Sequence, residues 1–249
     1  MSGHSKWSTI KRKKGAADQK RGKEFSKLIR VIVAAAREGG GDIESNGKLR
    51  TAIDKARSIN MPKDTMTQAI KRGTGEIEGM QFEELNYEGY GPGGIALLIE
   101  TVTDNRNRTT ADIRHLLSKY GGSLGETGCV QWMFNKKGVI YVPAAGTDED
   151  KLTEIGIEAG ADDVAREDES FRVTCEPSDF ETLKKALEAG GFKIEESEIS
   201  MEPQTTIKLD RKQAESVLRL MGMIEENDDV ENVYSNFDIS DEIMAQLDQ

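Results

Sequence analysis

The sequence has few of the residues that build disulfide scaffolds or zinc sites. Its 249 residues include only two cysteines, Cys129 and Cys175, and two histidines, His4 and His115. Two cysteines far apart in sequence are too few for a disulfide scaffold, which fits a reducing compartment. Because no Cys-x-x-Cys pair is present, no zinc motif can be recognised, and we expect no metal site.

Long apolar runs are also lacking. The longest aliphatic runs, residues 31–36 and 95–99, are far shorter than the ~20 residues that a membrane span needs. The first residues contain no apolar stretch of the kind found in secretory signals. We therefore expect a cytoplasmic protein with no membrane partner. At roughly 150 residues per domain, the length predicts two domains or three small ones.

The charged residues, in contrast, are numerous and unevenly distributed along the chain, whose net charge is −11. Residues 1–80 hold 18 lysines and arginines against 9 acidic residues, whereas residues 81–249 hold 16 against 36. Residues 1–37 alone hold 11 basic and 2 acidic residues, which accounts for the whole N-terminal excess. This asymmetry predicts a polyanion-binding arm attached to an acidic body.

Hydrophobic periodicity predicts three short helices in the first 80 residues and an alternation of strands and helices afterwards. The predicted N-terminal helices cover residues 15–37, 47–59 and 62–73. Further on, helices are predicted over residues 109–120, 148–159, 178–189 and 210–226. Strands are predicted over residues 95–102, 128–135, 138–143, 162–165, 170–175, 192–201, 205–209 and 231–239.

The order of these elements predicts an α+β fold. Residues 138–201 follow a β-α-β-β-α-β order, and the segments on either side follow the same order when they are joined. One split β-α-β unit could therefore enclose a second one. A linear division of the chain at about residue 136 is the simpler alternative.

The first candidate site is the basic N-terminal segment. Lysines and arginines bind phosphate backbones by releasing counterions, and Trp7 could stack on a base or pack on the body. The alternative is a solvated tail without a partner. The basic candidates are Lys6, Lys11, Arg12, Lys13, Lys14, Lys20, Arg21, Lys23, Lys27 and Arg30.

The second candidate is the segment Asn105-Arg106-Asn107-Arg108-Thr109, which links a predicted strand to a predicted helix. We expect Thr109 to cap the helix, and Arg106 and Arg108 to bind a phosphate together with the free N–H groups at the helix start. The alternative is an ordinary loop in which an arginine pairs with Asp104 or Asp112.

Other motifs give little support to nucleotide binding or catalysis. The glycine-rich residues 89–94 resemble a phosphate loop in composition, but they lead into a predicted strand and lack the Gly-Lys-Ser/Thr ending. We interpret them as a turn. His115 has no neighbouring serine or cysteine pattern, and Cys129 and Cys175 alternate with apolar residues as small core residues do. We therefore expect no catalytic residues.

Three motifs in this order resemble the YebC/PmpR family over essentially the whole chain: Ser2-Gly3-His4-Ser5-Lys6-Trp7, Tyr87-Glu88-Gly89-Tyr90-Gly91-Pro92-Gly93-Gly94 and Asn105-Arg106-Asn107-Arg108-Thr109. The resemblance implies a basic three-helix domain over residues 1–79 followed by two ferredoxin-like α+β domains. One comprises residues 80–135 plus 204–249, and the other, residues 136–203, is inserted in it.

The resemblance also implies a function. Members of the family are usually described as probable transcriptional regulators that bind DNA in the cytoplasm, and others as translation factors acting at the ribosome. The family has no established catalytic residues and no required cofactor. We therefore expect a non-enzymatic DNA-binding regulator. The alternative is a ribosome-associated factor that binds rRNA or tRNA, because phosphate contacts do not distinguish DNA from RNA.

Overall fold

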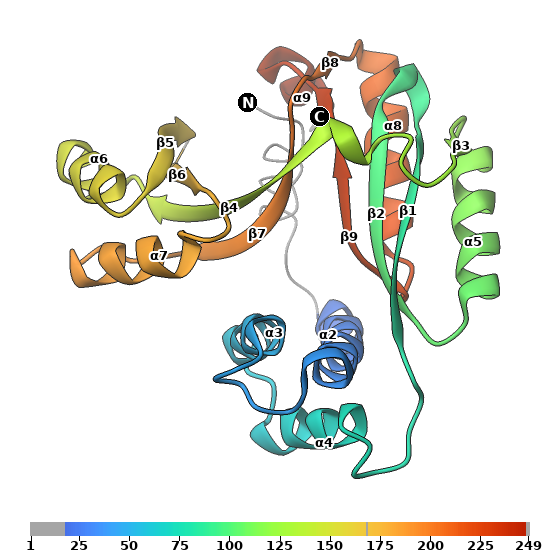
Figure 1. Ribbon diagram of the computed structural model, residues 1–249. Helices are drawn as coiled ribbons and strands as arrows, with labels where there is room; N and C mark the ends of the chain where they lie inside the picture. Colours follow the sequence, from blue (N-terminus) through green and yellow to red (C-terminus); the bar gives the residue numbers. More distant parts are fainter. Residues whose placement is uncertain (1–17, 168, 248–249) are drawn as a thin grey trace. The chain divides into compact units, whose positions relative to one another are not determined.

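The computed structural model describes residues 18–167 and 169–247 and has an α+β fold. The chain forms two compact units (Figure 1). The first comprises Trp132–Thr205, and the second comprises the described residues on either side of that segment. The three-domain boundaries at residues 79, 135 and 203 stay a prediction.

Three helices open the described chain: α2 (Asp18–Gly39), α3 (Gly47–Ser58) and α4 (Lys63–Gly73). Their apolar faces form one core in which Ile32, Leu49 and Ile53 are fully buried. The close approach of α4 to α2 requires a glycine at position 73, since a Cβ there would lie 2.5 Å from the carbonyl oxygen of Val33. The predicted helix positions are thus confirmed from residue 18 onwards.

The second unit also contains a four-stranded antiparallel sheet in the order β3-β1-β2-β9. Its strands are β1 (Glu83–Tyr90), β2 (Ala96–Thr103), β3 (Ser123–Leu124) and β9 (Val230–Ser235). Helices α5 (Arg106–Lys119) and α8 (Arg211–Glu225) pack on the face of β2 that carries Leu97 and Ile99 (Figure 1). The C-terminal helix α9 (Asp241–Leu247), which was not predicted, adds Ile243 to this core.

Several predicted strands in this unit are wrong. Residues 128–135 are not one strand, because the 3₁₀ helix η2 (Gln131–Met133) separates residues 128–130 from the next strand, which starts at Phe134. Residues 205–209 contribute only β8 (Ile207–Lys208), which pairs with β10 (Phe237–Asp238) in a separate two-stranded sheet. The place between β2 and β3 is taken instead by β1, which was not predicted.

The Trp132–Thr205 unit follows the predicted β-α-β-β-α-β order. It consists of β4 (Phe134–Pro143), α6 (Glu149–Glu158), β5 (Ala161–Glu167), β6 (Ser170–Cys175), α7 (Phe180–Ala189) and β7 (Glu196–Pro203). The sheet order β5-β6-β4-β7, with all neighbours antiparallel, is the ferredoxin-like arrangement. This unit lies in the chain between β3 and β8, so both neighbouring segments of the other unit flank it in sequence.

None of the helices in the described residues has the length and apolar character to span a membrane.

Candidate nucleic-acid interface

The predicted N-terminal arm lies mostly outside the described residues. This holds for Lys6, Trp7, Lys11, Arg12, Lys13 and Lys14. Lys20 and Arg21 belong to α2, but their side chains are also outside what is described. The roles of these residues stay predictions.

The other three predicted cations of α2 differ in their surroundings. Lys23 is exposed. The Lys27 ammonium donates a hydrogen bond to the carbonyl oxygen of Glu225 at 2.5 Å. The Arg30 guanidinium pairs with the carboxylate of Asp229 at 2.5 Å and also donates to the carbonyl oxygen of Asp228 at 2.9 Å. Lys27 and Arg30 thus already contact the segment that joins α8 to β9.

Helix α5 begins three residues earlier than predicted. Its N-cap is Asn105, whose side-chain oxygen accepts a hydrogen bond from the backbone N–H of Arg108 at 3.1 Å. Asparagine is at least as good an N-cap as threonine, and here it occurs first in the chain. The prediction that Thr109 caps the helix is therefore wrong. Thr109 is buried within the first turns, and its hydroxyl lies 2.8 Å from an Asp229 carboxylate oxygen.

Asp229 is the buried centre of a polar group that we call the Asp229 cluster, and its members are Arg30, Thr103, Arg108, Thr109 and Asp229. The Asp229 side chain is 4% exposed. Nη2 of Arg108 lies 2.7 Å and 3.0 Å from the two Asp229 oxygens and 2.8 Å from an Asp104 oxygen. Thr109 and Thr103 contact each other and the same carboxylate oxygen of Asp229.

These contacts alter the ionisation of both partners. Burial opposes ionisation of Asp229, but the hydrogen bonds from Arg108 and Thr109 and the charges of Arg108 and Arg30 outweigh it and hold the pKa of Asp229 below its usual range. The hydrogen bonds from Arg108 to Asp229 and Asp104 raise the pKa of Arg108. The cluster is therefore a fixed set of ion pairs over the ordinary pH range.

The two arginines of the junction thus have different surroundings. Arg108 pairs with Asp104, as the ordinary-loop alternative expected, and it also pairs with Asp229. Arg106 is exposed, and its side chain makes no ion pair with any residue that the structure describes. A phosphate at Arg108 would have to compete with two carboxylates, whereas Arg106 has no such competitor. The phosphate-binding role of both residues stays a prediction.

The glycine-rich motif at residues 87–94 is a structural hairpin. Glu88, at the end of β1, is 2% exposed, and its carboxylate accepts hydrogen bonds from the N–H groups of Gly128, Val130 and Gln131 at 2.6–2.8 Å. Burial raises the pKa of Glu88, but these three bonds outweigh it and lower the pKa overall. Gly93 and Gly94 have φ of +78° and +79°, values that favour glycine in the turn before β2. Of the residues 89–94 that were interpreted as a turn, Gly91–Gly94 form one, whereas Gly89 and Tyr90 belong to β1.

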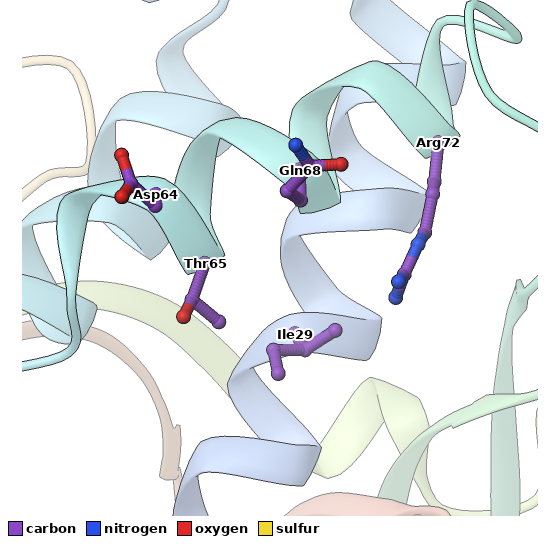
Figure 2. Close-up of a pocket in the computed structure, with 5 residues that line it drawn as sticks. All are labelled: Ile29, Asp64, Thr65, Gln68 and Arg72. Carbon is purple, nitrogen blue, oxygen red and sulfur yellow. The ribbon is translucent and has the colours of Figure 1, made fainter.

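A groove between α2 and α4 has a volume of about 320 Å³ (Figure 2). Ile29 of α2 lines it on one side, and Asp64, Thr65, Gln68 and Arg72 of α4 line it on the other, with Thr65 and Arg72 extending toward α2. One acid and one arginine do not form the convergent set of donors that a phosphate site has. Within residues 18–167 and 169–247, no three histidine, cysteine or acidic side chains gather in a way that would hold a metal ion.

No pattern in the sequence indicated Asp229 as a functional or structural centre. It lies 121 residues from Arg108 in the chain, in the acidic run of residues 225–229. In the folded chain it contacts Thr103 at the end of β2 and Arg108 and Thr109 at the start of α5.

Comparison with known proteins shows the family. A model described as the TACO1/YebC protein N-terminal domain matches residues 5–76, and one described as the TACO1/YebC second and third domain matches residues 82–237. The chain belongs to the TACO1/YebC family. The resemblance noted from the three motifs is thereby confirmed.

Relatives match nearly the full length of the chain. A probable transcriptional regulatory protein of Geobacter sp. (strain M21) is 58% identical over 99% of this chain and 100% of the relative. One from Geobacter sulfurreducens is 57% identical with the same coverage. The crystal structure of a conserved hypothetical protein from Aquifex aeolicus is similar at 46% identity, with a TM-score of 0.82 over 91% of this chain and 94% of that one.

Proposed function

We propose that this protein is a non-enzymatic, DNA-binding transcriptional regulator of the cytoplasm that binds phosphates through its basic N-terminal segment and α2. One observation carries the proposal: residues 1–37 hold 11 basic and 2 acidic residues in a chain with a net charge of −11. The full-length relatives that are named probable transcriptional regulatory proteins support it.

The proposed mechanism is electrostatic. Lysines and arginines that neutralise phosphates release condensed counterions, so the affinity falls with the logarithm of the salt concentration. Such contacts orient the protein on a nucleic acid but do not read its sequence. Lys23 and Arg106 are exposed and can contact phosphates directly, whereas Lys27 and Arg30 would first have to leave their contacts with residues 225–229.

The second candidate function is a ribosome-associated translation factor that binds rRNA or tRNA. The composition of the basic segment is consistent with this function, because its candidate contacts are the point charges of lysines and arginines. Such charges fit the phosphates of either nucleic acid, and sequence-specific DNA control needs base-reading side chains in addition.

The test is neutralisation of the arm by the combined substitutions Lys11→Gln, Arg12→Gln, Lys13→Gln and Lys14→Gln. Fluorescence anisotropy measures the affinity of the full chain for a 30-base-pair duplex DNA and for a structured ribosomal RNA fragment. We expect the affinity to fall at least tenfold at low salt, since each phosphate contact contributes a salt-dependent increment. A larger loss for the RNA than for the DNA would favour the second candidate function.

A matched control removes four exposed lysines elsewhere, by Lys136→Gln, Lys185→Gln, Lys193→Gln and Lys208→Gln. Both variants change the net charge equally, so a long-range effect of charge would weaken both. If the arm variant binds like the control variant, the assignment of the arm is wrong.

A further inference from the structure

Helices α5 and α8 form a locally basic layer on an acidic body. Together they carry seven lysines and arginines against three acidic residues, although residues 81–249 as a whole hold 16 against 36. The two helices pack against each other on one core. The exposed cations at the outer side include Lys119 of α5 and Lys212 and Arg219 of α8.

Two of these cations meet on one aromatic ring. Nζ of Lys119 lies 5.5 Å from the centre of the Tyr120 ring, and Cζ of Arg219 lies 5.8 Å from the same centre. Tyr120 directly follows α5 and packs against the core under α5 and α8, so its ring is held in place. Cation–π attraction then holds both charges near this fixed ring. We call Lys119, Tyr120 and Arg219 the Tyr120 cluster.

Neither cation of the Tyr120 cluster has a carboxylate partner in the described part of the chain. Some of the other described cations do have one, as Lys48, Arg57, Lys137 and Arg172 each pair with an acidic side chain. Two positive charges on one ring repel each other, and an external anion would relieve that repulsion. Glu215 lies one helical turn from Arg219 and from Lys212, but it forms no ion pair with either of them.

The surroundings of the Tyr120 cluster favour a phosphate backbone over a protein surface. Stable protein interfaces have an apolar core, and aromatic or aliphatic side chains supply it. The large hydrophobic side chains that are exposed in the described residues are Met80, Tyr90, Trp132 and Ile157, and all four lie outside α5 and α8. Point charges on rigid helices, without an apolar patch, fit a nucleic-acid backbone.

We propose that Lys119, Arg219 and Lys212 form a second phosphate-binding surface, which contacts the backbone of the same nucleic acid that the N-terminal segment binds. This inference rests on the proposed function for the identity of the partner, but it depends on different residues. Tyr120 acts as a positioning residue that holds the two cations together. The surface adds affinity without reading base sequence.

The test is the double substitution Lys119→Gln with Arg219→Gln in the full chain, with the same duplex DNA and ribosomal RNA fragment as probes. We expect the affinity to fall on the order of tenfold at low salt, with an unchanged melting temperature because both side chains are exposed. The single substitution Glu215→Gln should have the opposite effect and strengthen binding severalfold. Lys185→Gln with Lys193→Gln is the control of equal charge change.

The possible outcomes separate this inference from the proposed function. If the arm variant loses affinity but Lys119→Gln with Arg219→Gln binds like its control, the second surface is overturned and the proposed function stands. If the wild-type chain binds neither nucleic acid, both are overturned. If the double variant loses affinity for polyglutamate while nucleic-acid binding is unchanged, the partner is an acidic protein and the inference is overturned.

Discussion

Arg108 and Arg219 carry the same charge on two helices that pack against one core, yet their surroundings are opposite. Arg108 pairs with the carboxylates of Asp104 and Asp229, although its own side chain is 45% exposed. Arg219 shares the ring of Tyr120 with a second cation and has no acidic partner in the described residues. Exposure alone therefore does not show whether a cation is available to a ligand. The presence of an internal carboxylate decides it.

The same difference occurs along α2. Arg30 pairs with Asp229, which also pairs with Arg108, so one buried carboxylate neutralises cations from two separate helices. Lys23, two turns earlier on α2, is exposed. Cations that help to hold the fold together and cations that remain available for a partner can therefore lie on one helix.

The largest effect should come from removing the shared carboxylate. Asp229→Ala removes the carboxylate partner of Arg30, one of the two carboxylate partners of Arg108 and an acceptor of the Thr109 hydroxyl. Breaking a buried ion pair costs about 3–5 kcal/mol, and because both arginines are partly exposed we expect about 2–4 kcal/mol here. Urea denaturation of Asp229→Ala measures this loss. Asp228→Ala, at the exposed neighbouring position, is the control and should change the free energy of unfolding by less than about 0.5 kcal/mol.

The acid dependence of stability should come partly from the same carboxylate. Because the pKa of Asp229 is lower in the folded chain than in the unfolded chain, its contribution is fully present above the unfolded value of about 3.9. It is lost as the pH falls through the lowered folded value. Asp229→Asn should therefore be less stable than wild type at pH 7 and approach it near pH 2. A constant difference between the two proteins over this range would contradict the ion-pair account.

A smaller effect should separate the two arginines at the start of α5. Arg108→Gln should reduce the free energy of unfolding by about 1–2 kcal/mol, because it removes charged hydrogen bonds to a buried carboxylate, and it should leave nucleic-acid affinity nearly unchanged. Arg106→Gln should change stability by less than about 0.5 kcal/mol and weaken binding severalfold. Melting temperature and anisotropy on both variants measure this. The opposite pattern would mean that Arg108 is the phosphate ligand.

Much of the fold could be predicted from hydrophobic periodicity, but β1 could not. Its sequence, EELNYEGY, has few apolar residues, because only some of its positions face the core and Glu88 is buried as an acceptor of backbone hydrogen bonds. Residues 205–209 were predicted as a strand of the same domain, but only the short β8 forms there, and it lies in a separate sheet. The strand between β2 and β3 is β1. β1 and β2 are neighbours in the chain and form a hairpin, but β1 lacks the alternation of apolar and polar residues that marks a half-buried strand.

The candidate site was predictable only in part. The sequence identified Arg106 and Arg108 and raised the alternative of a pair with Asp104, which is confirmed for Arg108. It could not identify Asp229, which lies in an acidic run with no apolar pattern around it and meets α5 only in the folded chain. The Tyr120 cluster was missed for the same reason, since α5 and α8 are separated in sequence by the whole Trp132–Thr205 unit.

By this account, exposed cations without a carboxylate partner in the fold bind phosphates, and cations with such a partner do not. The most direct test is the salt dependence of duplex-DNA affinity for the wild type, Arg108→Gln, and Lys119→Gln with Arg219→Gln. The slope of log K against log salt is about −0.9 for each phosphate contacted. We expect the slope to become shallower by about 2 in the Lys119 and Arg219 variant and to stay unchanged in Arg108→Gln. A shallower slope in Arg108→Gln, with none in the double variant, would contradict the claim.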